Sequence, residues 1–251
     1  MNFDQLLYDF NPISLDEMDE VRLLNRTDTK FVFNNKHLQE ILPFLKDAYS
    51  SLEINGKRAA QYRTLYFDTE EFQLYKQHHN GKKNRNKVRF RSYVDSNLNF
   101  LEVKFKDNKG RTHKSRIMVD AIEEELSDTS KTFLKTTQVG EKKLVAKIWN
   151  SFKRITLVNL KAKERLTLDF DLTFEQDGKK YTLDNIIVAE VKQEKASGDS
   201  DFIKLMRANH ICNSRISKYC TGTALLNTDL KHNLFKEKLL QLKKISNEFS
   251  A

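Results

Sequence analysis

Charged side chains, most of them basic, occupy alternate positions in several short stretches of this sequence. The stretches carry Lys87, Arg89 and Arg91; Glu102, Lys104 and Lys106; Lys114 and Arg116; and Arg165, Asp169 and Asp171. Alternation is the period of a β-strand, so each stretch gathers its charges on one face. Guanidinium and ammonium groups bind phosphate oxygens well. The pattern therefore predicts a site for a polyanion.

The same pattern has a simpler interpretation. An antiparallel sheet with one solvated face often carries Lys and Arg, which improve solubility and protect sheet edges. For any one strand this interpretation is favoured. However, like charges directly opposite on neighbouring strands repel by roughly a few tenths to 1 kcal/mol per pair. Repetition over four stretches, with Arg prominent, therefore favours a bound anion.

The elements that position these charges are predicted to be short strands with helices between them. Strands are expected at about 26–33, 61–69, 87–93, 99–106, 111–119, 152–159, 165–176 and 186–193. Helices are expected at about 14–24, 35–45, 71–79, 197–206 and 229–249, with weak helical patterns across 127–149. The order lacks the regular strand–helix rhythm of a parallel sheet and predicts an antiparallel α+β fold. Eight strands that close into a barrel leave room for one threadlike ligand.

Length and composition limit the organisation and the partners. A chain of 251 residues with 7 Gly and 2 Pro has few candidate linkers, so one domain over 1–251 is expected, with the terminal helices at about 14–24 and 229–249. The net charge of +9 favours an acidic partner, which can be nucleic acid, nucleotide, polyphosphate or an anionic membrane. Composition does not choose among these four.

Several classes of protein are disfavoured. No apolar run approaches the roughly 20 residues that cross a bilayer, and the N-terminus lacks the pattern of a signal peptide, so a cytoplasmic protein is expected. Cys212 and Cys220 lack CxxC spacing, and the six His are scattered. A structural zinc site, a disulfide framework and a histidine metal site are therefore not expected.

Eight motifs in order carry a resemblance to a known family. They are RTDTKFVF, YRTLYFDT, KVRFRSY, LEVKFK, RTHKSR, RLTLDFDL, VAEVKQE and SRISKYCTGTALL. This series resembles the VTC domain of polyphosphate polymerases, a branch of the triphosphate tunnel metalloenzymes, and covers about residues 26–226. The resemblance implies a closed antiparallel eight-stranded β-tunnel with helices packed on the outside. It also implies that the tunnel binds triphosphate groups with basic residues and a divalent metal, Mn²⁺ or Mg²⁺.

The resemblance also implies roles for individual residues. The implied catalytic residues are Lys30, Arg89, Arg91, Lys104 and Arg165. The predicted substrate-binding residues are Lys114, Arg116, Ser217 and Lys218, which the resemblance implies, together with Arg63, Lys87, Lys106 and Lys192. The implied metal ligand is Glu190, in the motif VAEVK. The expected reaction transfers the γ-phosphate of ATP to a growing polyphosphate chain.

Two positions depart from the family's pattern. The superfamily opens with Glu-x-Glu-x-Lys, whereas this chain has Arg26 at the first position, Asp28 at the second and Lys30 at the third. Loss of the first Glu argues against typical triphosphatase or adenylate cyclase members and fits the VTC branch, with Asp28 left as an assisting residue. Lys163 stands near the place of a tyrosine-containing motif, and its role stays open.

Other functions remain open at this point. The same tunnel can serve an inorganic or nucleoside triphosphatase, or a non-catalytic polyphosphate-binding domain. From the residues alone, an ion-pair role with neighbouring cations is the favoured interpretation of Glu190, and Ser217 with Lys218 can be an ordinary helix start. Asp169 and Asp171 are expected to balance the charge of the interior.

The expected partners are ATP, polyphosphate or another triphosphate. Nucleic acid is disfavoured because Phe90, Phe105 and Phe170 alternate away from the charges, whereas single-strand sites mix aromatic and basic side chains. The resemblance allows a membrane-protein partner, which would place the chain at the inner face of a membrane. The oligomeric state stays open.

Overall fold

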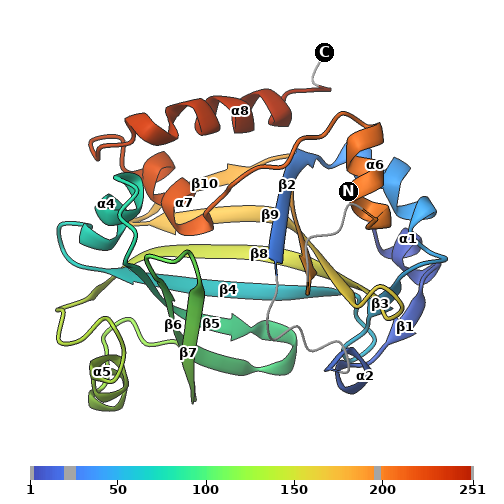
Figure 1. The fold of residues 1–251 in the computed structure, drawn as a ribbon. Coiled ribbons are helices and arrows are strands. Elements are labelled where there is room, and N and C mark those ends of the chain that lie inside the picture. Colours follow the sequence, from blue (N-terminus) through green and yellow to red (C-terminus); the bar gives the residue numbers. More distant parts are fainter. Residues whose placement is uncertain (1–2, 20–26, 195–198, 250–251) are drawn as a thin grey trace.

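The computed structural model describes residues 3–19, 27–194 and 199–249, and a large antiparallel sheet dominates them (Figure 1). The path of hydrogen-bonded strands is β2-β11-β9-β8-β4-β5-β6-β7. In this order the strands are Thr27–Asn34, Ile186–Gln193, Glu164–Gln176, Val145–Asn159, Ala59–Asp68, Arg85–Tyr93, Leu98–Lys106 and Thr112–Val119. Three shorter strands, β1 (Asn11–Ile13), β3 (Ser50–Leu52) and β10 (Lys179–Leu183), attach beside this path.

Helices lie on both sides of the sheet, and the expected antiparallel α+β class is confirmed. They are α1 (Asp4–Tyr8), α2 (Leu15–Asp19), α3 (Lys36–Ile41), α4 (Gln73–His79), α5 (Asp128–Lys135), α6 (Asp201–Ala208), α7 (Lys218–Leu226) and α8 (Lys236–Ser246). In Figure 1, α8 runs along the top of the molecule, with α7 between it and the sheet. No described helix has the length and apolar character needed to cross a membrane.

The closed tunnel expected from the sequence is not found in the strand pairing. Strands β2 and β7 lie at the two ends of the path, and the described strands show no pairing between them. Most side chains of β7 are exposed, so this strand forms an open edge. The side chains nevertheless bring the two ends of the sheet together, as the site below shows.

Some boundaries differ from those expected. The weak helical pattern at 127–149 yields a helix only at Asp128–Lys135, and β8 already begins at Val145. Ser14 and Glu17 form the expected reciprocal cap: Glu17 N–H donates to Ser14 Oγ at 3.3 Å, and Ser14 N–H donates to Glu17 Oε2 at 2.8 Å. The expected end of that helix falls at residues 20–26, outside the described residues. The C-terminal helix is shorter than expected and begins at Lys236.

The two faces of the sheet differ in composition. Its outer face is apolar: Phe31 packs against Phe202 of α6 in one core cluster, while Val88 and Phe90 pack with Leu134 of α5 in another. The opposite face, here called the inner face, carries the side chains of Lys30, Tyr62, Lys87, Arg89, Arg91, Glu102, Lys104, Arg154, Asp169 and Glu190. The outer core is covered by helices, so the charged face is turned inward.

Helix α7 packs directly onto the inner face. Its residues from Tyr219 to Ala224 are all buried. A Cβ at Gly222 would lie 2.3 Å from Cδ1 of Phe174 and 2.9 Å from Cδ1 of Ile148. Only glycine allows this close approach, which fixes where the N-terminus of α7 lies.

We therefore expect Gly222→Ala to lower the free energy of unfolding by about 1–3 kcal/mol, because the added methyl group overpacks a filled core. Urea denaturation measures the change. Gln241→Ala on the exposed side of α8 is the control and is expected to stay within about 0.5 kcal/mol of wild type. Equal stability of the two variants would show that α7 lies farther from β9 than the structure places it.

Candidate anion-binding site

A row of three lysines crosses the strands β5, β6 and β7. Lys87 is paired with Lys104, and Lys104 with Lys114. Like charges directly opposite in a sheet are destabilising. Lys87 relieves part of this repulsion by donating a hydrogen bond from Nζ to Ser217 Oγ, at 2.9 Å. The row concentrates positive charge on one wall of the inner face.

The next row is Arg89, Glu102 and Arg116, in register on the same strands. Glu102 is 0% exposed, and its Oε2 accepts from Arg89 Nε at 2.8 Å and Nη2 at 2.6 Å. Its other oxygen forms an ion pair with Lys114. Although burial opposes ionisation, Arg89, Arg91 and Lys114 hold the pKa of Glu102 well below its usual range. One carboxylate thus anchors two of the surrounding cations.

Two cations, the buried Arg91 and the half-buried Lys104, have no carboxylate ion-pair partner in the part of the chain that the structure describes. Arg91 is 8% exposed, its Nε has no hydrogen-bond partner, and its guanidinium lies 5.7 Å from the ring centroid of Tyr62. Burial and repulsion by Arg89 lower the pKa of Arg91. Repulsion by Arg89 and burial lower the pKa of Lys104 well below its usual value. The inner face therefore carries positive charge that the described side chains leave uncompensated.

Strands β2, β11 and β9 form the opposite wall of the site. Glu190 is paired with Lys30 on one side and with Thr167 on the other. Its carboxylate lies 3.0 Å from Lys30 Nζ and also contacts Lys192. Against the cost of burial, these two lysines lower the pKa of Glu190 well below its usual value. The predicted metal ligand is thus ionised and held by two cations.

Arg154, which the sequence analysis did not single out, belongs to the site. Its Nε lies 2.5 Å from Asp169 Oδ1 and its Nη2 lies 2.8 Å from Oδ2. Lys218, the first residue of α7, donates to Asp169 Oδ2 at 2.5 Å. Asp169 therefore balances interior charge, as expected, and it ties the N-terminus of α7 to β8 and β9.

The segment that leads into α7 connects the two ends of the sheet: Ser214 N–H donates to the backbone oxygen of Lys30 in β2 at 2.7 Å, and Ser217 Oγ accepts from Lys87 in β5. Arg89 and burial have the largest effects on the pKa of Lys104, and Glu190 from the far end of the sheet opposes them. Lys30 of β2 likewise lowers the pKa values of Lys87 and Lys218, in both cases after the larger effect of burial. The sheet therefore curves until the two charged walls share one site.

Most of the predicted residues meet in this site. They are Lys30, Lys87, Arg89, Arg91, Lys104, Lys114, Arg116, Arg165, Glu190, Lys192, Ser217 and Lys218. Asp28, at the rim of β2, is paired with Lys192. Burial lowers the pKa of Lys192, and the negative charge of Asp28 offsets part of this effect. Lys106 is exposed at the end of β6, opposite Arg85. Lys163 is exposed in the turn before β9.

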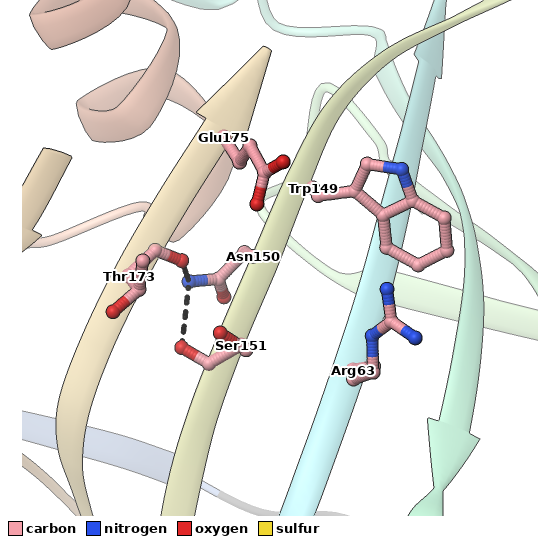
Figure 2. A pocket seen from close by; sticks show the side chains of 6 residues that line it. All are labelled: Arg63, Trp149, Asn150, Ser151, Thr173 and Glu175. Atoms are coloured by element: carbon pink, nitrogen blue, oxygen red, sulfur yellow. Dashed lines mark hydrogen bonds between the residues drawn. The ribbon is translucent and has the colours of Figure 1, made fainter. Parts of the chain in front are cut away.

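Arg63 does not join them and is withdrawn from the set. It is paired with Ser92 and Ser151, and so points to the outer face, opposite to Tyr62 and Thr64. Its guanidinium lies 4.5 Å from the ring of Trp149, at the edge of a small pocket on the outer side of the sheet (Figure 2). Asp171 is also exposed; it sits at a bulge of β9 and pairs with Lys153 at 3.1 Å.

A buried carboxylate outside the charged rows holds the helices in place. Asp68, at the end of β4, accepts hydrogen bonds from the backbone N–H groups of Leu74 and Tyr75, both at 2.8 Å, and from Tyr219 Oη at 2.5 Å. Burial raises the pKa of Asp68. These bonds fasten α4 and α7 to one strand end. No charge alternation marks Asp68, so the pattern search could not find it.

The carboxylates of the inner face fit a divalent cation that substrate phosphates also help to hold. No cluster of three His, Cys, Asp or Glu suitable for a metal exists among the described residues. Glu190 lies on β11 beside the rim residue Asp28 of β2. Mg²⁺ is commonly held by one or two carboxylates together with substrate phosphates. The donor set fits that arrangement and does not fit an all-protein metal site.

Lys218 makes the site sensitive to pH. Burial, which outweighs the attraction of Asp169, lowers its pKa from 10.5 to about 8. We expect the affinity for tripolyphosphate to fall as pH rises through about 8, because Lys218 loses its charge. Between about 8 and 10.5 the unfolded chain binds a proton that the folded chain does not, so this residue makes the free energy of unfolding rise with pH.

Calorimetric titration with tripolyphosphate from pH 7 to 10 measures the first effect. Lys218→Arg keeps its charge over this range and is expected to lose less affinity above pH 8 than wild type. The same pH dependence in both proteins would show that another group titrates.

Comparisons with known proteins place the chain in a family. The model of the VTC domain family matches residues 25–227. A search of curated proteins finds no match. Among solved structures, the chain resembles a putative adenylyl cyclase from Hippeastrum with a dominant triphosphatase activity (15% identity, 82% of this chain and 97% of that chain, TM-score 0.46).

Two microbial structures show similar values. A putative adenylate cyclase from Bacillus halodurans has 14% identity over 77% of this chain and 94% of that chain, with a TM-score of 0.46. The PH1819 protein of Pyrococcus horikoshii has 15% identity over 81% of this chain and 100% of that chain, with a TM-score of 0.44. The family assignment rests on the match over 25–227, which contains every inner-face residue named above: this chain belongs to the VTC domain family.

Proposed function

We propose that the protein is a metal-dependent polyphosphate polymerase that transfers the γ-phosphate of ATP to a growing polyphosphate chain. The observation that carries this proposal is the excess of positive charge on the inner face, where the buried Arg91 and the half-buried Lys104 lack a carboxylate ion-pair partner among the described residues. A triphosphate would supply the missing negative charge. Membership in the VTC domain family supports the same chemistry.

The triphosphate would lie between the two walls of the site. The lysine row of β5, β6 and β7 lies on one wall, and Lys30 and Glu190 of β2 and β11 lie on the other. Lys218, at the N-terminus of α7, lies beside Asp169 of β9. An anion held by both walls would join the two ends of the sheet that no strand pairing connects. In this proposal the tunnel is completed by its ligand.

A divalent cation, Mn²⁺ or Mg²⁺, would neutralise part of the negative charge of the substrate phosphates. Glu190 would hold it, with Asp28 beside it on β2. For this, Glu190 must give up part of its contact with Lys30 or Lys192, which would then be available to the phosphate oxygens. The chain thus supplies one metal ligand and, by the same movement, more positive charge for the substrate.

Transfer to phosphate is favoured over transfer to water by the state of the carboxylates. Glu102, Asp169 and Glu190 each contact two cations, and cations hold the pKa of each below its usual value. Such groups are weak bases and activate water poorly. An ionised terminal phosphate needs no base. Its oxygen attacks the γ-phosphorus, the bond from that phosphorus to the β–γ bridging oxygen breaks, and ADP leaves with the electron pair.

The test is incubation with ATP and Mn²⁺, with the products separated by length on a gel. Chains of many phosphates that disappear when EDTA removes the metal are the expected result. Orthophosphate without chains would replace the proposal with a triphosphatase, which uses the same site with water as acceptor. Binding without turnover would leave a polyphosphate-binding domain.

A further inference from the structure

The inner face changes character along β5, β6 and β7. Beyond the two charged rows, the same face carries partly exposed apolar side chains, here called the aromatic patch: Tyr93, Leu98, Phe100 and Met118. Phe100 is paired with Arg91 on one side and Met118 on the other. Leu98 is 40% exposed and Met118 is 66% exposed. The patch therefore continues directly from the cationic rows.

The rings of the patch are arranged around cations. The rings of Tyr93 and Phe100 meet edge to face with centroids 5.9 Å apart. The ring centroid of Tyr93 lies 5.0 Å from that of Tyr62. The guanidinium of Arg116 lies 4.5 Å from the Phe100 ring. A partly exposed aromatic ring beside a guanidinium offers flat surfaces on which a nucleobase can stack. These aromatic side chains share the face of the charges, unlike Phe90, Phe105 and Phe170.

The backbone beneath the patch is held firmly. Asp95, in the turn that follows Tyr93, accepts hydrogen bonds from Lys57 Nζ at 2.8 Å and from the backbone N–H of Gln61 at 2.6 Å. Asn55 donates to the backbone oxygen of Asp95 at 3.3 Å. These contacts fix the β5–β6 turn against the start of β4. The ring of Tyr93 is therefore preorganised, which lowers the cost of binding a ligand on it.

We propose that the aromatic patch holds the base of a bound nucleoside triphosphate while the charged rows hold its phosphates. A nucleotide is a polyanion joined through a sugar to a flat, weakly polar ring. The inner face has the same order, with the charged rows followed by the aromatic patch. Tyr93 follows Arg91 by two residues, roughly 7 Å along the strand, a distance that the sugar can bridge. This inference rests on the proposed function for the position of the triphosphate.

Calorimetric titration of ATP and of tripolyphosphate, both with EDTA to prevent turnover, tests the patch. Tyr93→Ala and Phe100→Ala are expected to weaken ATP roughly tenfold and to change tripolyphosphate affinity by less than about twofold, since one stacking contact is lost. Tyr93→Phe keeps the ring and is expected to bind ATP like wild type. Phe105→Ala, on the outer side of the same strand as Phe100, is the matched control and is expected to change neither ligand.

The inference would be overturned if Tyr93→Ala and Phe100→Ala lowered the affinities for ATP and tripolyphosphate equally, or lowered neither affinity. The outcome is separate from that of the polymerase assay. If the wild-type protein makes no polyphosphate but the variants lose affinity for ATP alone, the polymerase proposal is refuted and the base site is supported. A protein that makes polyphosphate with an unchanged ratio of the two affinities refutes the base site alone.

Discussion

Lys104→Met is expected to reduce polyphosphate synthesis by at least about 100-fold while raising the free energy of unfolding by about 0.5–2 kcal/mol. Lys104 stands between Lys87 and Lys114 in the lysine row, and its lowered pKa shows that the folded state disfavours its charge. Methionine fills a similar volume and removes the repulsion. The same substitution removes a cation that would stabilise charge on the transferred phosphate.

Polymer yield and urea denaturation, measured on one preparation, check both parts of this prediction. Lys106→Met is the matched control, because Lys106 follows on the same face of β6 but is exposed. It is expected to change stability by less than about 0.5 kcal/mol and to keep most of the activity. If Lys104→Met is less stable than wild type, the charge of Lys104 is compensated in the folded protein. If the variant still synthesises polyphosphate at the wild-type rate, Lys104 does not contact the substrate.

The charged rows were predictable because the β-period is exact. Once Lys87, Arg89 and Arg91 lie on one strand, alternation alone puts them on one face, and the short turn to β6 fixes the register with Glu102 and Lys104. The motif carrying Glu190 was found by resemblance, and the structure places it opposite Lys30. Local periodicity and short turns thus account for most of the site.

Alternation did not identify which face of β4 and β8 points inward. In β4, both faces carry polar and aromatic residues, so Arg63 was assigned to the interior, whereas Tyr62 and Thr64 point there. In β8, Lys153 and Arg154 are adjacent and must point apart, and the sequence does not tell which one enters the site. A bulge opposite Ser151 and Lys153 shifts the register further. Such choices depend on tertiary packing.

Closure of the sheet is also not a property of single strands. Each strand can have the right alternation while the pairing of β2 with β7 depends on how far the whole sheet curves. Here curvature brings the side chains of the two ends together without joining their backbones. We expect an anion between the two walls to favour their closer approach, because both walls carry basic side chains.

This reasoning leads to the variant with the largest expected loss of stability, Glu102→Gln. Glu102 is fully buried and neutralises Arg89 and Lys114, so its removal leaves two more cations uncompensated beside Lys104 and Arg91. Breaking a buried ion pair from one side costs about 3–5 kcal/mol. The pKa of Glu102 is below its ordinary 4.5, so wild type keeps this contribution above that pH and loses it as pH falls further.

Tripolyphosphate provides the decisive control for this variant. If the loss of Glu102 leaves a deficit of negative charge at the anion site, the variant should bind tripolyphosphate more tightly than wild type. At the same ligand concentration the ligand should then stabilise the variant more than wild type, by about 2.7 kcal/mol at 100 times the variant's dissociation constant. Urea denaturation with and without tripolyphosphate measures the recovery. Glu70→Gln, which removes the exposed carboxylate that lies 3.5 Å from Lys147 Nζ, is expected to cost less than about 1 kcal/mol. Equal or smaller stabilisation of Glu102→Gln than of wild type at the same tripolyphosphate concentration would show that the cations around Glu102 do not form an anion site.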